Sequence, residues 1–101
     1  MTIIEKNSEL HQQMVTWRHH LHKHPELSFN EKMTSDYIAS ILQSHDIEIH
    51  RGLAVTGIVA TVHGQKEGSV IGLRADMDAL PIQELNDFSY KSVHDGKMHA
   101  C

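Results

Sequence analysis

Apolar residues recur every three or four positions in the first part of the chain, which is the spacing of one face of a helix. Four of them define a single stripe: Leu10, Met14, Trp17 and Leu21. This pattern predicts a helix over residues 4–23. The helix should end before Pro25, because the residue that precedes a proline is pushed out of the helical conformation.

A second stretch of helical spacing follows a short connector. Its predicted apolar face consists of Met33, Tyr37, Ile38, Ile41 and Leu42. In the segment "SFNE", Ser28 and Glu31 have the spacing of a capping box, in which each side chain bonds the backbone of the other. We therefore expect this second helix to start with the box and to run to about Ser44.

The pattern then changes from helical to alternating. In residues 47–50 isoleucines alternate with polar side chains, which predicts a strand with one wet side. The segments "GIVATVHG" and "VIGLRA", separated by the turn-forming "GQKEGS", predict a hairpin. The second is almost entirely apolar and is expected to be a buried central strand. The prediction is an α/β fold, two helices followed by a β-sheet, with mostly loop after Asp76.

Composition narrows the class of protein. The chain has 101 residues, of which 40% are apolar and 22% charged, and this suits one small globular domain or part of one. A net charge of -4 without a basic stripe predicts no nucleic-acid partner. The sequence has neither a signal-peptide pattern nor an apolar run long enough to span a bilayer, so we expect no membrane partner and a cytoplasmic location.

The segment "LRADMDALP" is the first candidate site. Asp76 and Asp78 follow the predicted central strand, and open α/β sheets usually place their ligand crevices at the carboxyl ends of strands. Two carboxylates on one face can bind a hard cation or orient a histidine ligand. The alternative is a surface turn in which Arg74 is the ion-pair partner.

The chain has ten histidines and one cysteine, and they suggest two further sites. His99 and Cys101 are two apart and could both reach one zinc or similar ion, or Cys101 could be an inert thiol. In "HHLHKHPE", His20 and His24 have the spacing of two ligands on a helix. The alternative for them is a solvated cluster favoured by the helix C-terminal dipole.

Three stretches in order, "RHHLHKHPELSFNE", "GLRADMDALPI" and "GKMHAC", resemble motifs of the metal-dependent amidohydrolases and peptidases. That family includes hippurate hydrolase, N-acyl-amino-acid aminoacylases, acetyldiaminopimelate deacetylase and indole-acetyl-amino-acid hydrolases. The resemblance covers residues 17–101. It implies that residues 1–101 are the N-terminal part of a zinc-peptidase-like catalytic domain, without the family's dimerisation domain.

The resemblance also implies roles for particular residues. The third motif of the family continues as M-H-A-C-G-H-D, so Cys101 is expected to bind a divalent metal, zinc or manganese, whereas His99 is not. The catalytic aspartate is placed at Asp76, with Asp78 as the close alternative, and its expected role is to orient a ligand and tune the metal. In the first motif His20 stands where the family usually has an aspartate.

The implied reaction is hydrolysis of the amide bond of an N-acyl amino acid or peptide by a metal-activated water. The general base and the remaining ligands are expected beyond residue 101, so the chain by itself should be inactive and should bind metal weakly. Family members are often homo-oligomers. Two rival hypotheses are a non-enzymatic metal-binding module built on the histidine cluster and an interaction segment with an exposed sheet edge.

Overall fold

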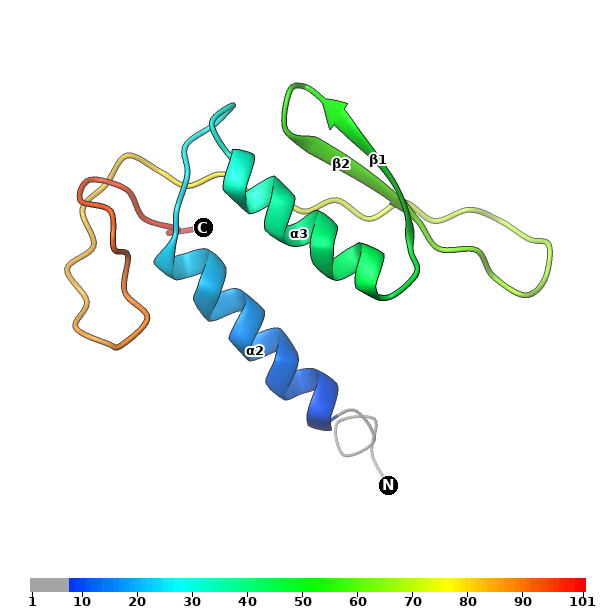
Figure 1. Cartoon of the computed structure of the whole chain (residues 1–101), viewed down its shortest axis with the longest axis horizontal. Helices are drawn as coiled ribbons and strands as arrows, with labels where there is room; N and C mark the ends of the chain where they lie inside the picture. The colour runs from blue at the N-terminus through cyan, green and yellow to red at the C-terminus, as the bar shows by residue number, and fades with distance from the viewer. Residues whose placement is uncertain (1–7) are drawn as a thin grey trace. The chain divides into compact units, whose positions relative to one another are not determined.

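The computed structural model describes residues 8–101, so the part of the first predicted helix over residues 4–7 lies outside the described residues. The elements are α2 (Ser8–Lys23), α3 (Lys32–Ser44), β1 (Glu48–Leu53) and β2 (Gly57–Thr61) (Figure 1). The predicted order of two helices followed by a sheet is confirmed. The described residues form two compact units, one of residues 8–25 with 79–101 and the other of residues 26–78.

In the first unit, α2 presents the predicted apolar stripe but buries none of its residues. Leu10 and Met14 are 42% and 53% exposed, while Trp17 and Leu21 are half-buried. The helix ends at Lys23, before Pro25, as predicted. Pro25 itself is fully buried. Thus the C-terminal half of α2 carries most of the helix's contacts.

The loop of residues 79–101 is tied to the C-terminal end of α2 and to itself. The amide of Val93 donates to the carbonyl of Lys23 at 2.9 Å. Leu80 and Met98 form an isolated antiparallel bridge, with backbone bonds of 2.9 and 3.0 Å. These bonds give a segment without helix or strand a defined path.

In the second unit, α3 ends at Ser44 as expected, but the predicted capping box is wrong. Glu31 is the N-cap residue and makes no side-chain capping bond. Glu26 caps the helix instead: its carboxylate accepts bonds from the amides of Met33 at 3.2 Å and Thr34 at 2.5 Å, and from the Thr34 hydroxyl at 2.6 Å. A carboxylate is well placed there because the first amides of a helix have no partner within it.

Helix α3 covers its predicted apolar face only in part, because Tyr37, Ile38, Ile41 and Leu42 are half-buried. Its buried residues are Thr34, Ser35 and Ala39, while Met33 is 73% exposed. Ser35 accepts a bond from Arg51 of β1 at 3.1 Å, and Asp36 pairs with the same guanidinium at 2.5 Å. Small side chains on this face let α3 lie close to the hairpin.

The hairpin consists of β1 and β2, an antiparallel pair in which Glu48 faces Thr61 and Arg51 faces Ile58. The prediction that residues 57–64 pair with residues 70–75 is therefore wrong. A bulge lies between Arg51 and Leu53, and the turn places Ala54 and Val55 at positive φ angles of 48° and 75°. Only a short turn separates β1 from β2 along the chain.

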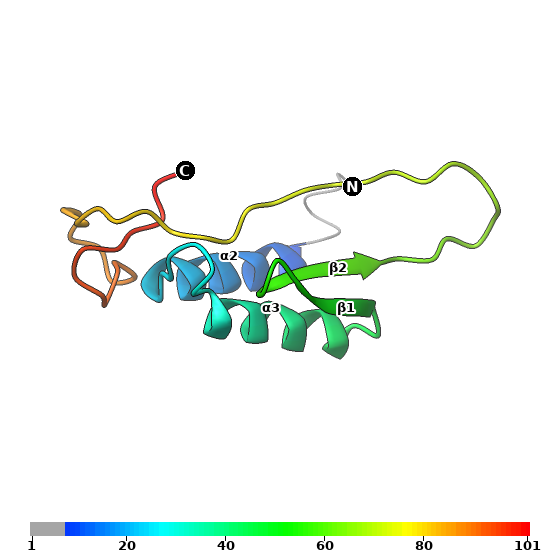
Figure 2. The same ribbon diagram turned by 90° about the horizontal axis from the view of Figure 1, so that it is seen from above.

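The expected central strand, residues 70–75, is not a strand in the structure. Val70, Ile71 and Leu73 are 96%, 84% and 96% exposed. Figure 2 shows this part of the chain as an extended trace that leaves β2 without pairing with it. An apolar strand of this kind needs cover on both faces, and the described residues do not supply it.

The core is correspondingly small. Among the described residues, the buried apolar side chains are those of Pro25, Ala39 and Ala79. The chain exposes 8276 Å² of surface, whereas a folded monomer of 11.5 kDa is expected to expose about 5,800 Å². Much apolar surface that a folded domain would bury is therefore open. Neither α2 nor α3 is long and apolar enough to cross a lipid bilayer.

Candidate functional site

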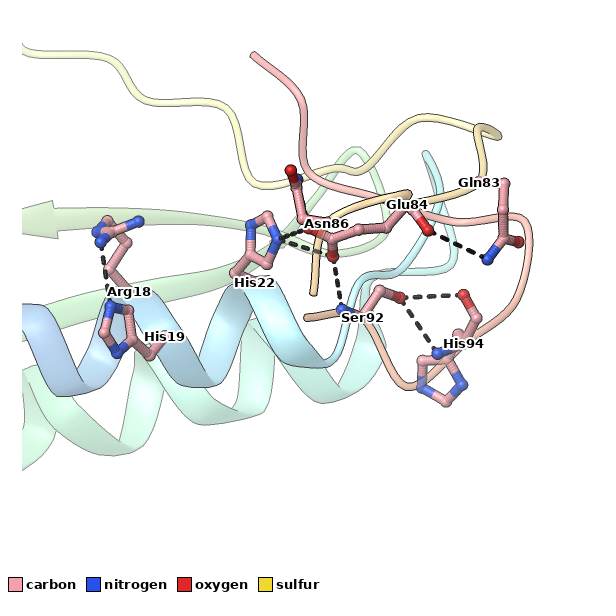
Figure 3. Close-up of polar contacts among 8 residues, drawn as sticks. All are labelled: Arg18, His19, His22, Gln83, Glu84, Asn86, Ser92 and His94. Atoms are coloured by element: carbon pink, nitrogen blue, oxygen red, sulfur yellow. Dashed lines mark hydrogen bonds and ion pairs between the residues drawn. The ribbon is translucent and has the colours of Figure 1, made fainter. Parts of the chain in front are cut away.

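A buried carboxylate organises the first unit. The side chain of Glu84 is only 2% exposed, and His22 Nε2 lies 3.0 and 2.9 Å from its two oxygens. Asn86 donates its side-chain amide to Glu84 at 3.0 Å, and the backbone amide of Ser92 donates at 2.6 Å (Figure 3). A carboxylate can only accept, so the proton of this contact belongs to His22 Nε2.

These contacts decide the ionisation of Glu84. Burial alone would raise the pKa of its carboxyl group, because the charged form loses hydration. The hydrogen bonds from Asn86, Ser92 and His22, together with the charge of His22, outweigh burial and lower that pKa from 4.5 to about 2. Glu84 is therefore a carboxylate throughout the neutral and mildly acidic range.

Aromatic rings surround His22. The rings of Phe88 and Tyr90 stack with their centroids 4.1 Å apart. Each also makes an edge contact with the ring of His22, with centroid distances of 5.7 and 5.8 Å. Tyr90 also stacks on His19 at 3.7 Å. The ring of His99 lies 6.5 Å from that of His22. The network therefore joins α2 to three places in the loop of residues 79–101.

The histidines at the end of α2 do not form a metal site with the rest of the described chain. The rings of His20 and His24 are 4.7 Å apart, and His94 lies 6.4 Å from His24. Burial, followed by the nearby charges of His20, Lys23 and His94, lowers the pKa of His24. Across residues 8–101, no group of three or more His, Cys, Asp or Glu side chains could hold one metal ion.

The predicted site residues lie at the surface. Asp76 accepts a bond from Arg74 at 3.3 Å, so the ion pair considered as the alternative for this segment is present. Asp78 is exposed. Cys101 is a free, exposed thiol. Asp76 and Asp78 belong to the unit of residues 26–78, and Cys101 belongs to the other unit. The catalytic role of the aspartates and the metal-binding role of Cys101 stay predictions.

The sequence did not single out Glu84, Asn86 or Ser92. All three lie in a stretch without helical or alternating periodicity, which gave no reason to expect a buried residue. His22 belongs to the first motif of the resemblance, but only the fold brings it to Glu84, 62 positions later. No local pattern could have predicted this pair.

Comparison with known proteins adds the family. The chain is 47% identical over 94 residues to an N-acyl-L-amino acid amidohydrolase of Geobacillus stearothermophilus, covering 92% of this chain and 25% of the relative. It is 38% identical over 101 residues to the hippurate hydrolase of Campylobacter jejuni, covering all of this chain and 26% of the relative. No protein-family model matches the chain.

The structure agrees with these relatives. A dinuclear metal-binding peptidase of the M20 family from Bacillus subtilis superposes with a TM-score of 0.87 at 43% identity, over 93% of this chain and 27% of the peptidase. The chain thus matches part of the length of hydrolases that act on amide bonds. More particularly, it is homologous to the M20 amidohydrolases and peptidases, and it spans about a quarter of the length of the curated relatives it matches.

Proposed function

We propose that the chain is the N-terminal part of the catalytic domain of a metal-dependent amidohydrolase that cleaves the amide bond of N-acyl amino acids or peptides. The observation that supports this proposal best is the 47% identity to an N-acyl-L-amino acid amidohydrolase over nine-tenths of the chain. The superposition on an M20 peptidase agrees with this proposal.

Within this proposal, Cys101 is a ligand of a divalent metal, zinc or manganese, and Asp76 orients a ligand and tunes the metal, with Asp78 as the alternative. The peptidase that superposes on the chain is described as dinuclear. The described residues do not fit a two-metal centre, because they bring no three ligands together. We therefore propose that the chain by itself neither binds metal tightly nor hydrolyses amides.

The first experiment tests the isolated chain. The purified 101 residues, supplied with zinc or manganese, should not turn over N-acetyl or N-benzoyl amino acids. Calorimetry should show no stoichiometric sub-micromolar metal binding that depends on Cys101. Chelator-sensitive turnover, or tight binding that disappears in Cys101→Ser, would show that the chain assembles a working site alone.

The second experiment tests whether the chain can serve an active site. Residues 1–101 replace the matching quarter of the Geobacillus amidohydrolase, and the hybrid is assayed on N-acetyl amino acids with metal present. We expect hydrolysis, which Cys101→Ser should abolish and Asp76→Asn should reduce about 10- to 100-fold, the usual cost of losing a residue that orients a metal ligand.

Asp87→Asn is the matched control for the aspartate, because Asp87 is also exposed and should leave the rate unchanged. Asp78→Asn separates the two candidates: a larger loss in this variant than in Asp76→Asn would move the role to Asp78. A folded hybrid without activity, or one indifferent to Cys101→Ser, would contradict the proposed function.

A further inference from the structure

Histidines gather at the contact between the C-terminal end of α2 and the loop that packs against it. The half-buried ring of His24 lies 4.7 Å from the ring of His20 on the helix and 6.4 Å from that of His94 on the loop. The residues that precede them along the chain, Lys23 and Val93, are joined by a backbone hydrogen bond of 2.9 Å. Three imidazoles therefore lie where the loop meets the helix end.

The charges that act on His24 come from His20 and Lys23 on the helix and from His94 on the loop, and each is positive when protonated. Histidine is the side chain that gains its charge in mild acid. Burial, followed by these charges, lowers the pKa of His24 from its ordinary 6.5. The negative end of the helix dipole acts the other way, but burial and the neighbouring cations outweigh it. The packed loop therefore favours the neutral form of His24.

We propose that this contact is a pH-sensitive switch: the loop is held at the helix end while the histidines are neutral and separates from it when they are protonated. Separation lets a protonated His24 regain hydration and moves it away from His94. Because the pKa of His24 is lower in the closed form, the contact is fully stable above about pH 6.5 and weakens as the pH falls through the lower value. The inference concerns the chain as it stands and does not rest on the proposed enzymatic function.

The neighbouring contact of the same loop does not respond in this pH range. The amide of Ser92 donates to the carboxylate of Glu84 at 2.6 Å (Figure 3). The pKa of Glu84 is about 2, so this acceptor stays ionised in mild acid. Ser92 and Val93 are consecutive, yet the first is bonded within the loop and the second to the helix end. Acid should therefore open one contact of the loop without unfolding the loop.

Nuclear magnetic resonance of the 101-residue chain between about pH 7.5 and about pH 5 tests the switch. We expect the protection of the Val93 amide against hydrogen exchange to fall about two- to tenfold, because like charges and a buried imidazolium oppose the contact. Cross-relaxation between the rings of His24 and His94 should weaken with the same midpoint, below pH 6.5. The protection of the Ser92 amide should not fall.

Variants of the cluster separate its charge from its packing. His24→Gln stays neutral, so the protection of the Val93 amide should lose most of its pH dependence. His94→Gln removes the charge on the loop and should reduce that dependence. His24→Lys stays cationic and should separate the loop from the helix end already at about pH 7.5. His11→Gln is the matched control and should follow the wild type, because His11 is exposed near the start of the same helix.

Three results would overturn the proposal. One is a Val93 amide whose protection is the same at both ends of the pH range. Another is a loss of protection that persists unchanged in His24→Gln and in His94→Gln, which would place the titrating group elsewhere. The third is a parallel loss at Val93 and Ser92, which would mean that acid unfolds the whole loop. Circular dichroism shows whether each variant remains folded, and His94→Gln alters an exposed side chain, so it provides the test if His24→Gln does not fold.

Discussion

At the scale of single residues, the His22–Glu84 contact is the most consequential feature of the structure. Glu84 is buried, and each of its oxygens has a donor. A buried carboxylate that lost these donors would be left without hydration or partners, which is strongly destabilising. The contact therefore holds the loop of residues 79–101 on α2.

The lowered pKa of Glu84 predicts how the chain responds to acid. The pKa of Glu84 is about 2 in the folded state and 4.5 ordinarily, so folding stabilises the ionised form of this carboxyl group. The resulting stability is complete above pH 4.5 and is lost as the pH falls toward 2. Urea unfolding at several pH values should show this loss in the wild-type chain.

Glu84→Gln should unfold at a lower urea concentration at pH 7 and should lose less stability between pH 4.5 and 2. Asp87→Asn, an exposed carboxylate in the same loop, is the control and should follow the wild type. Glu48 contributes a smaller dependence in the same direction, because the hydrogen bond from His63 lowers its pKa. An acid response unchanged in Glu84→Gln would contradict the assignment.

At the scale of elements, the start of α3 shows where local reasoning stops. The spacing of Ser28 and Glu31 fits a capping box, yet Glu26 bonds the first amides of the helix. Phe29, which lies between Ser28 and Glu31 in the sequence, adopts a positive φ of 66°. The chain turns back at this residue and brings Glu26 to the end of the helix. The sequence predicted the helix, but the turn decided which side chain caps it.

A pair of substitutions distinguishes the two caps. Glu26→Ala should destabilise the chain by about 1 kcal/mol, the typical cost of removing a capping side chain. Ser28→Ala should have little effect, because Ser28 is exposed and Glu26 caps the helix instead. Thermal unfolding followed by circular dichroism measures both. A larger loss of stability in Ser28→Ala than in Glu26→Ala would contradict the cap by Glu26 and support the capping box.

At the scale of the whole molecule, the chain exposes too much apolar surface for its mass. The described residues bury only two alanines and one proline among their apolar side chains, while Val70, Ile71 and Leu73 are open to solvent. This agrees with the comparisons, in which the chain matches about a quarter of each relative. A segment that is covered in a larger fold would show such a surface.

This surface predicts a shallow denaturant transition. The slope of the unfolding free energy against urea scales with the surface exposed on unfolding, and small compact proteins give about 1–3 kcal/mol/M. We expect a slope at or below about 1 kcal/mol/M. A slope near the upper end would mean that the chain buries much more surface than the structure shows.

Side-chain spacing and short motifs were enough to predict the two helices, their ends at Lys23 and Ser44, and the resemblance that the comparisons confirmed. These follow from side-chain spacing and from short motifs, which are local properties. Three features became known from the fold alone: β2 pairs with β1, residues 70–75 stay unpaired, and Glu84 contacts His22. Each of these depends on which distant surface is available, because a strand or a buried charge is stable only when another part of the chain covers it.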